Sequence, residues 1–403
     1  MTTQTLKGFR DFLPKQMAIR NRVINTLKQV FESYGFAELA TPTLEYAEVL
    51  TGKYGEEAEK LMYLFKDQGD RNVGLKYDLT VPLARVMAQY PDLPKPFKRY
   101  QIQPAFRAEN TQKSRYREFY QCDIDTVGTT SLYADAEILA VISDSLKALG
   151  FTDFTIRINS RKILFGITNS TSVLQSLDKL DKKSETEVKQ ELADKGLVVD
   201  EISEIFASLK SATADADLQL VMNLAQQLGV TQLKFDPTLV RGLDYYTGTI
   251  FETVVTQPKI GSITGGGRFD NLISSLGGPN LPAVGTTLGL DRICDVIAEL
   301  NLWPDLSPTS TQILVTVFNP DLMDKSIELS IKLRRGKVAI ELYPDDQTKL
   351  EKQLKYASDK GIPYVAILGP EEIAKNLVTL KNMSTGEQKQ LPADKLVSSV
   401  SQN

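Results

Sequence analysis

Residues 106–125 read FRAENTQKSRYREFYQCDID, and this stretch decides how the rest of the chain is interpreted. Cations, carboxylates and aromatic rings alternate in it as in two strands joined by a loop, with charges where an ordinary core would carry Val or Leu. The basic residues extend outward, because residues 95–117 hold seven Lys or Arg and one acid, Glu109. A basic island in a chain of net charge −4 indicates a site for a polyanion. A solvated hairpin with surface ion pairs is the alternative.

Length and composition predict a multidomain protein with ordinary hydrophobic cores. The 403 residues are 42% hydrophobic and 24% charged, which favours two or three domains. No run approaches the roughly 20 apolar residues of a membrane span, and the first residues lack the basic and apolar segments of a secretory signal. Cys122 and Cys294 are too few for a disulfide framework or a zinc site, so we expect a chain of the reducing cytoplasm.

Histidine is absent from the sequence, where average usage would place about eight. Its absence excludes Ser-His-Asp hydrolases, Cys-His proteases, His-ligated metals and imidazole general bases. Any catalysis must therefore use carboxylates, cations, hydroxyls, backbone amides or a bound ion.

The pattern along the first 300 residues predicts a mostly antiparallel sheet flanked by helices. Apolar residues recur at helical spacing from Ile19 to Phe31, and Gly35 follows where a helix C-cap belongs. A strand is expected over 37–44, at an edge or an interface because it contains Pro42. The other expectations are strands at 74–79, 97–106, 117–127, 155–158 and 240–255, and an amphipathic helix at 134–149.

Charged helical segments dominate residues 168–233 and predict an inserted helical subdomain. A stretch rich in Pro, Ser and Thr marks a linker, beyond which strands and helices alternate as in a small α/β domain with mostly parallel strands. The expected domains are a main domain in two parts (1–167 and 234–300), the insertion (168–233), a linker (301–310) and a C-terminal domain (311–403).

Two groups of polar residues are predicted to lie on strands near the opening stretch. Asp78 and Thr80 would share one face of a strand and offer a carboxylate and a hydroxyl to an ammonium group, although such a pair is commonly just a strand end. Gln121, Asp123 and Asp125 share a face by the period of two and would form the polar floor of a pocket, or else a solvent-facing strand.

Three segments that contain glycine complete the pattern. Residues 241–249 bracket two tyrosines with glycines beside an arginine, which suits a small aromatic substrate or an aromatic turn. Residues 265–271 begin with three glycines, which allow a ligand to approach closely or make a tight turn. Residues 285–292 form a strand-to-helix passage that ends in an arginine at the site edge. The arginines gathered in this way are Arg107, Arg115, Arg241 and Arg292. They predict electrostatic phosphate chemistry without a protein nucleophile, with carboxylates able to hold Mg²⁺.

Taken in this order, the segments resemble the histidyl-tRNA synthetase family of class II aminoacyl-tRNA synthetases. The matching parts are residues 7–14 (the family's N-terminal sequence), the context of Pro42 (motif 1, at the dimer interface), 106–125 (motif 2), 241–249 and 265–271 (the two peptides peculiar to histidyl enzymes) and 289–292 (motif 3). The resemblance covers essentially the whole chain. It implies an α+β class II fold, with an antiparallel sheet flanked by helices, a helical insertion and a C-terminal α/β anticodon-binding domain.

The resemblance also implies the roles of single residues. Those assigned to histidine are Asp78, Thr80 and Gln121 for its α-amino group, Asp125, Tyr245 and Tyr246 for its imidazole, and Arg107 and Arg241 at its reacting end. Those assigned to ATP are Arg107 at the α-phosphate, Glu109 at the adenine and the motif 2 loop, and Arg115 and Arg292 at the β- and γ-phosphates, with Mg²⁺ accompanying ATP through ligands not assigned. The sequence departs from common bacterial forms where Ala108 and Tyr120 replace frequent histidines, and where Asp replaces Glu at 78, 125 and 291.

The implied function is ATP-dependent ligation of histidine to its tRNA through a histidyl-adenylate, with Arg107 and Arg241 as catalytic residues. Neither step needs a side-chain nucleophile, so a chain without His can catalyse both. One alternative is a non-catalytic regulatory subunit of histidine biosynthesis, which typically lacks motif residues and the C-terminal domain. Another is a class II synthetase for prolyl, threonyl or glycyl transfer, against which residues 241–246 argue.

The implied partners are tRNA and a second copy of the chain, in the cytoplasm and without a membrane. A basic cluster (Lys332, Arg334, Arg335 and Lys337) would touch the anticodon stem-loop, or form only a solvated helix end. The loop 110–114 is expected to read the acceptor end. We also hypothesise that the lack of His lets such an enzyme be made when histidyl-tRNA is scarce; compositional drift and engineering are the alternatives.

Overall fold

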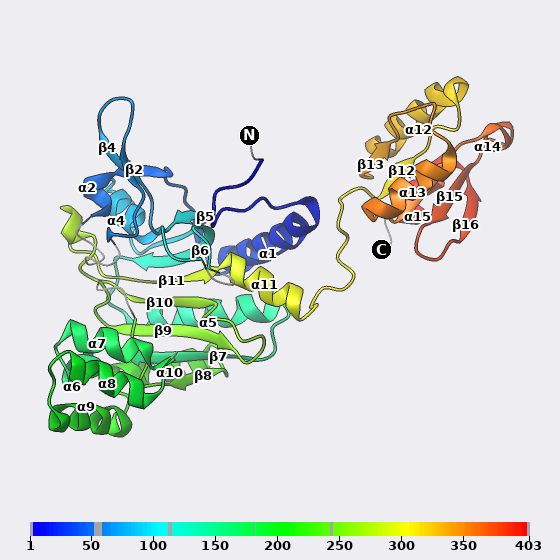
Figure 1. Cartoon of the computed structure of the whole chain (residues 1–403). Coiled ribbons are helices and arrows are strands. Elements are labelled where there is room, and N and C mark those ends of the chain that lie inside the picture. Colours follow the sequence, from blue (N-terminus) through cyan, green and yellow to red (C-terminus); the bar gives the residue numbers. More distant parts are fainter. Residues whose placement is uncertain (1–2, 52–58, 112–114, 182, 242–244, 401–403) are drawn as a thin grey trace. The chain divides into compact units, whose positions relative to one another are not determined.

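The computed structural model describes residues 3–51, 59–111, 115–181, 183–241 and 245–400, with the elements labelled in Figure 1. The chain forms two compact units, one of residues up to Asp11 with Arg22–Trp303 and one of Phe12–Asn21 with the residues from Pro304 onward. Helix α1 (Pro14–Ser33) ends as predicted, because Gly35 adopts φ of 78° and its N–H donates to the Glu32 carbonyl. Among the described residues, no helix is long and apolar enough to cross a membrane.

The first unit is built on an eight-stranded sheet in the order β1-β5-β6-β11-β10-β9-β7-β8. Its strands are β1 (Ala37–Glu38), β5 (Phe97–Phe106), β6 (Glu118–Val127), β7 (Phe154–Ser160), β8 (Leu233–Phe235), β9 (Thr249–Val255), β10 (Thr264–Arg268) and β11 (Ala283–Gly289). Neighbours pair antiparallel except at the two edges, where β1 runs parallel to β5 and β8 parallel to β7. The predicted antiparallel sheet is therefore confirmed.

One face of the large sheet is covered by helix α5 (Leu132–Ala148), which contacts the central strands β6, β10 and β11 (Figure 1). Along β6, side chains alternate between the two faces of the sheet. Cys122 and Ile124 are fully buried, while Gln121, Asp123 and Asp125 point the other way, into a cavity. Helix α11 (Leu290–Glu299) continues directly from β11 and also contacts β6.

Helices follow β7 in the region where the sequence predicts a helical insertion at 168–233, and the first of them begins earlier, at Arg161. The helices after β7 are α6 (Arg161–Ile167), α7 (Thr171–Leu177), the 3₁₀ turn η1 (Asp178–Asp181), α8 (Glu185–Asp194), α9 (Val199–Ser211) and α10 (Ala216–Gln227). Ser184 and Glu187 form a capping box at the start of α8. Buried side chains such as Val188 of α8 and Ile202 of α9 belong to one core with residues of the sheet, which anchors the insertion to it.

Three strands predicted from the sequence are shorter in the structure, one of them being the strand expected over 240–255, which begins only at Thr249 in β9. The segment 37–44 is interrupted, with β1 ending at Glu38 and β2 (Leu44–Tyr46) beginning after Pro42, since proline has no N–H for a strand ladder. The segment 74–79 forms a strand only in β4 (Asn72–Leu75), and helix α4 (Thr80–Gln89) follows. Strands β2, β4 and β3 (Leu64–Lys66) make a separate antiparallel sheet, with the short α2 (Ala47–Leu50) after β2.

The second unit contains a five-stranded sheet in the order β13-β12-β14-β15-β16. Strands β12 (Ile313–Val315), β13 (Ile340–Leu342) and β14 (Tyr364–Ile367) are parallel as predicted, whereas β15 (Val378–Asn382) and β16 (Gln388–Leu391) are antiparallel. Its helices are α12 (Met323–Arg335), α13 (Leu350–Lys360), α14 (Pro370–Lys375) and α15 (Ala393–Val400). The sequence did not predict β16, because this exposed edge strand, Gln-Lys-Gln-Leu, lacks an apolar run.

Candidate active site

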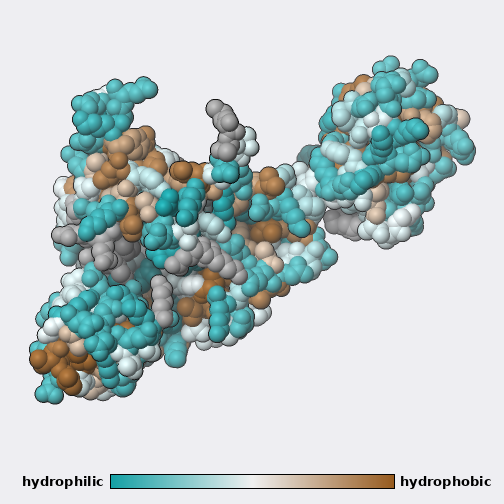
Figure 2. Space-filling model, in the orientation of Figure 1, coloured by the Kyte–Doolittle hydropathy of each residue, from teal (hydrophilic) through white to brown (hydrophobic). Residues whose placement is uncertain are grey.

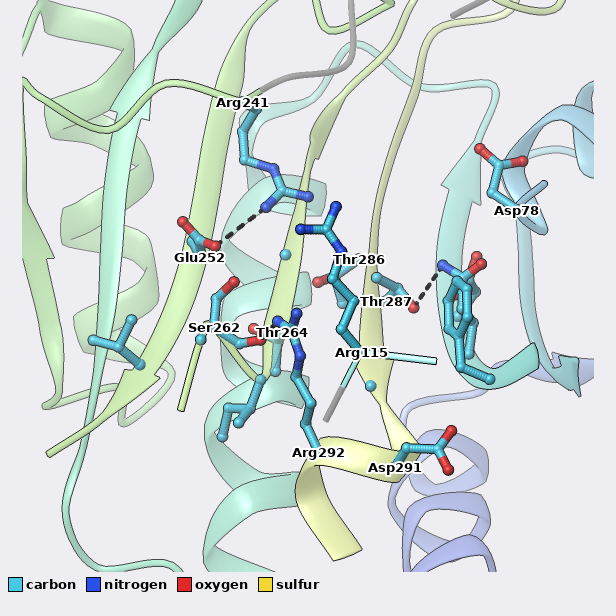
Figure 3. Close-up of a pocket in the computed structure, with 18 of the residues that line it drawn as sticks. Asp78, Arg115, Arg241, Glu252, Ser262, Thr264, Thr286, Thr287, Asp291 and Arg292 are labelled. Atoms are coloured by element: carbon cyan, nitrogen blue, oxygen red, sulfur yellow. Dashed lines mark hydrogen bonds and ion pairs between the residues drawn. The ribbon is translucent and has the colours of Figure 1, made fainter. Parts of the chain in front are cut away.

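A cavity of about 990 Å³ lies in the first unit, on the sheet face away from α5 (Figure 3). All eleven residues that the sequence assigned to substrates line it: Asp78, Thr80, Arg107, Glu109, Arg115, Gln121, Asp125, Arg241, Tyr245, Tyr246 and Arg292. The fold therefore brings together at one place the predicted segments 78–80, 106–125, 241–249, 265–271 and 285–292.

The floor of the cavity is polar because β6 turns Gln121, Asp123 and Asp125 toward it, as the period of two predicted. Strand β11 lies alongside, with Gly285 opposite Asp125 and Thr287 opposite Asp123. A Cβ atom at Gly285 would overlap the carboxylate of Asp125, so a glycine is needed there. Gln121 Nε2 donates to Thr287 Oγ1 at 3.1 Å (Figure 3).

Asp78 and Thr80 stand at the start of helix α4, so the prediction that they share one face of a strand is wrong. Asp78 Oδ1 accepts the N–H of Thr80 at 3.1 Å and that of Val81 at 3.0 Å, which satisfies amides at the helix N-terminus. Both predicted side chains nevertheless line the cavity. In Figure 3, Asp78 lies across the cavity from Arg241.

Tyr245 and Tyr246 form an aromatic wall with Phe269. The centroids of the two tyrosine rings are 4.8 Å apart, and those of Tyr245 and Phe269 are 6.0 Å apart. Burial raises the pKa of both hydroxyls, so they remain neutral hydrogen-bonding groups near neutral pH. A neutral aromatic wall beside carboxylates suits a small aromatic ring that carries N–H groups. Residues 242–244 of the same predicted segment lie outside the described residues.

Four arginines make the opposite side of the cavity positive: Arg107, Arg115, Arg241 and Arg292. Figure 3 shows the side chains of Arg115, Arg241 and Arg292 directed toward the same space. Burial and the positive charge of Arg115 both lower the pKa of Arg292, as expected for like charges held close together. A bound polyphosphate would relieve this repulsion and use the guanidinium groups as paired donors.

The first of the three glycines of β10 leaves room for Arg241, and the tight-turn alternative for the three is wrong, since residues 264–268 form a central strand. A Cβ atom at Gly265 would lie 2.5 Å from Arg241 Nη1, so the glycine provides the space that the guanidinium occupies. From the other side, Glu252 Oε1 lies 3.4 Å from Nη1 (Figure 3). The predicted close approach to the glycine backbone therefore occurs, and the group that approaches it is the guanidinium of Arg241.

Glu109 is tied to the arginine side of the cavity. Burial alone would raise the pKa of Glu109, but the hydrogen bond and charge of Arg115 lower it below its usual value. Arg117 Nε donates to the Glu109 carbonyl at 3.1 Å. The Glu109 carboxylate is therefore ionised near neutral pH, and Arg117 of the same predicted motif fixes the Glu109 backbone.

Sequence reasoning missed three residues that shape the site. Arg10 pairs with Asp291 at 2.6 Å, and its guanidinium lies 3.1 Å from the ring centroid of Tyr116, which ties residues near the N-terminus to the strand-to-helix passage. Glu252 supports Arg241, and Arg99 lies beneath the aspartates of the floor. Arg99 belongs to the basic island, but its position opposite Asp125 depends on the register between β5 and β6, so the sequence carried no signal that placed it in the site.

No group of three or more His, Cys, Asp or Glu side chains within the described ranges could hold a metal ion. The carboxylates near the arginines, Glu109 and Glu252, are instead engaged by Arg115 and Arg241. The protein side of the cavity therefore has the character of an anion site.

Two family models match the sequence. One, described as "Histidyl-tRNA synthetase", matches residues 8–293, and one described as "Anticodon binding domain" matches residues 312–403. Together these two ranges cover most of the chain.

Full-length relatives agree with the family models. A histidine–tRNA ligase of Cytophaga hutchinsonii is 40% identical over 97% of this chain and 98% of its own length, and one of Gloeobacter violaceus is 40% identical over 96% of each. The crystal structure of a histidyl-tRNA synthetase from Nostoc is 30% identical, covers 100% of this chain and 99% of its own, and superposes with a TM-score of 0.85.

Proposed function

The chain belongs to the histidyl-tRNA synthetase family, and from that premise we propose how its cavity joins histidine to tRNA with ATP. The observation that carries the proposal is the division of one cavity into a half that suits histidine and a half that suits polyphosphate. Carboxylates and neutral tyrosines form the first half, and four arginines form the second.

Histidine lies over the floor of the cavity. Asp78, Thr80 and Gln121 hold the α-ammonium group, because they offer a carboxylate, a hydroxyl and an amide from two elements that meet there. Asp125 accepts an N–H of the imidazole, which packs against Tyr245 and Tyr246. This arrangement leaves the histidine carboxylate directed toward the arginines.

ATP occupies the arginine half. Arg107 and Arg241 neutralise the α-phosphate and the histidine carboxylate, while Arg115 and Arg292 hold the β- and γ-phosphates. Glu109 supports the adenine and the backbone around it. Mg²⁺ enters with ATP as part of the substrate, bound to phosphate oxygens.

The reaction has two steps. An oxygen of the histidine carboxylate bonds to the α-phosphorus of ATP as the bond to pyrophosphate breaks, which gives histidyl-adenylate. The 3′-hydroxyl of the terminal adenosine of tRNA then attacks the acyl carbon, and AMP leaves. Positioning and neutralisation of charge accelerate both steps, so no imidazole is required of the protein.

Arg241→Ala tests the assignment most directly. We expect histidine-dependent ATP–pyrophosphate exchange to fall by at least about 100-fold, because a cation that faces the developing charge is lost. The control is Arg241→Lys, which keeps the charge without the paired donors and should retain more activity. Exchange within a few-fold of the original rate in Arg241→Ala would reject this role.

A regulatory subunit without catalysis is the weaker alternative. The chain retains Arg107, Arg241 and Arg292 in one cavity, and the anticodon-binding model matches its C-terminal residues. A protein that only sensed histidine would need the floor of the cavity but not its four arginines.

Transfer RNA is bound by both units in this proposal. The exposed cluster of Lys332, Arg334, Arg335 and Lys337 lies at the end of α12 and contacts the anticodon stem-loop. The acceptor end is read at residues 110–114, of which 112–114 lie outside the described residues. The proposal places the chain in the cytoplasm, where tRNA is charged for translation.

A second copy of the chain covers the small sheet in this proposal. Leu44, Tyr46, Leu64 and Phe65 each expose more than two fifths of their surface on β2 and β3. Figure 2 shows hydrophobic atoms gathered over the region of β2 and α2. A second cavity, of about 710 Å³, lies next to these strands and includes Pro42 in its lining. Apolar surface of this kind is typical of an interface between subunits.

A further inference from the structure

At their centres, two neighbouring strands turn three successive pairs of polar side chains toward one buried face of the sheet. In direct register, β5 and β6 pair Arg99 with Asp125, Gln101 with Asp123, and Gln103 with Gln121. Five of these six residues expose 6% of their surface or less, Gln103 being the exception. Burying charged and amide groups at this density opposes folding unless each is paired, so the arrangement calls for a functional reason.

Arg99 is the cation of this polar face, and it is fully buried. Its Nη2 lies 2.7 Å from Asp125 Oδ2 and 3.8 Å from Asp123 Oδ2. The same Nη2 donates to the Leu79 carbonyl at 3.2 Å, and Nη1 donates to Gln101 Oε1 at 3.3 Å. The guanidinium is therefore held by the protein, and Arg99 itself does not line the cavity.

A second row of polar groups fixes Arg99 from behind. Gln101 Nε2 donates to Thr41 Oγ1 at 2.8 Å and to Gln103 Oε1 at 2.6 Å. Gln103 Oε1 also accepts from the buried Lys76 Nζ at 2.6 Å. Because the Gln101 amide donates to two side chains, and Gln103 is itself held by Lys76, the Gln101 side chain is fixed in one orientation. Its Oε1 therefore stays directed at Arg99.

The groups that face Asp125 are mostly negative. Asp123 lies on the same strand and Asp78 at the start of α4, and the negative charge of Asp78 raises the pKa of both Asp125 and Asp123. Strand β11 offers only Gly285, Thr286 and Thr287 there, none of which titrates. Burial raises the pKa of Asp125 and of Asp123, and Arg99 opposes the rise at both. Without Arg99, the cation that contacts Asp125 would be lost, and Lys76, which acts on Asp123, would be the buried cation left behind the carboxylates.

We propose that Arg99 is a positioning residue that keeps Asp125 ionised and aimed, so that Asp125 accepts the imidazole N–H and the site selects histidine. The proposal rests on the function proposed above, in which Asp125 touches the substrate. An ionised carboxylate accepts hydrogen bonds and donates none. A protonated one would also donate, and would lose its preference for a ligand that presents an N–H.

The experiment compares Arg99→Gln and Arg99→Lys with the unaltered chain in histidine-dependent ATP–pyrophosphate exchange, from about pH 6.5 to about pH 8.5. For Arg99→Gln at neutral pH, we expect KM for histidine to rise by about 10- to 100-fold, because a hydrogen bond to a charged group is weakened. The kcat value and KM for ATP should change by about twofold at most, since no arginine of the phosphate half is altered.

The pH dependence separates positioning from structural support. Loss of Arg99 raises the pKa of Asp125 further, so Asp125 is protonated at low pH and ionises as pH rises. The ratio of KM for histidine in Arg99→Gln to that in the unaltered chain should therefore fall as pH rises. Taking this ratio cancels the titration of histidine itself. Arg99→Lys, which keeps the charge, should rescue most of the pH effect.

Matched variants complete the design. Arg268→Gln breaks another buried Arg–Asp pair of the same sheet and should lower stability without any pH-dependent change in the histidine KM ratio. If Arg99→Gln does not fold, the double variant Arg99→Gln/Asp123→Asn removes one of the buried negative charges and gives the same comparison. A constant ratio across pH, or equal losses in both KM values and kcat, would overturn the proposal. Absence of histidine-dependent exchange in the unaltered chain would instead reject the proposed function.

Discussion

At the scale of single residues, Gly285 allows the most direct test of the histidine pocket. A Cβ atom at this position would overlap the carboxylate of Asp125, whereas one at Gly289 on the same strand would meet its nearest atom at 3.5 Å. We expect Gly285→Ala to raise KM for histidine by about 10-fold or more, because Asp125 must leave its place, and to leave KM for ATP nearly unchanged. Gly289→Ala is the matched control and should have a much smaller effect. Steady-state ATP–pyrophosphate exchange kinetics would measure both KM values in each variant. Equal effects of the two substitutions would contradict the role of Gly285.

Residue types and the two-residue period of a strand predicted well which residues line the cavity. They failed where burial or backbone conformation determined the position of a side chain. Asp125 and Gln121 were found because alternation along a strand fixes which residues share a face. Asp78 was placed on a strand wrongly, because an Asp-Leu-Thr sequence also suits a helix start and only the following apolar turn distinguishes the two. Arg99 was missed because its role depends on the register between β5 and β6, which neither strand encodes alone.

At the scale of elements, one buried ion pair joins β10 to the start of α5. Arg268 pairs with Asp135, whose side chain is fully buried. Arg268 Nη1 also donates to the Thr129 carbonyl at 3.1 Å. The carbonyl of Arg268 accepts the N–H of Thr247 at 2.8 Å, which connects this joint to the tyrosine wall.

Asp135→Ala should therefore lower the free energy of unfolding by about 3 kcal/mol, because the buried guanidinium keeps only Asp270, whose carboxylate lies 3.3 Å away and is partly exposed. The double change Asp135→Leu/Arg268→Met, which removes both charges, should lose clearly less. Urea titration followed by circular dichroism measures both, and a double variant no more stable than Asp135→Ala would contradict this account of the pair.

The elements themselves were predictable where burial patterns are strong. Strand β5 has the predicted bounds, and β6 differs by one residue, because ten residues of alternating character leave little choice of boundary. Edge elements were harder. β1 is cut short before Pro42, and the exposed β16 has almost no apolar residue to signal a strand. Hydrogen bonding to a neighbour forms such strands, and that neighbour is fixed only by the tertiary fold.

At the scale of the whole molecule, adenylate formation and tRNA charging should be separable. Neutralising Lys332, Arg334, Arg335 and Lys337 is expected to reduce tRNA aminoacylation by at least about 10-fold, because phosphate contacts to the anticodon stem-loop are lost. Histidine-dependent exchange should stay within about twofold, since none of these residues lines the cavity. The control neutralises four other exposed lysines of the same unit, Lys352, Lys355, Lys375 and Lys389. Equal loss in both assays would reject a role of the cluster in tRNA binding.

The absence of histidine from all 403 residues is also a property of the whole molecule. Translation of this sequence consumes no histidyl-tRNA, the product that the enzyme itself supplies. The structure accommodates the absence, because Ala108 occupies a described backbone position and Tyr120 lines the cavity, with its N–H donated to Asp291 Oδ2 at 2.9 Å. Under histidine starvation, we expect synthesis of this chain to continue while a version with Ala108→His and Tyr120→His slows at those two codons. Ribosome profiling with pulse labelling measures both. Equal synthesis rates would leave compositional drift or engineering as the explanation, whereas pausing confined to the substituted codons would tie the composition to the supply of histidyl-tRNA.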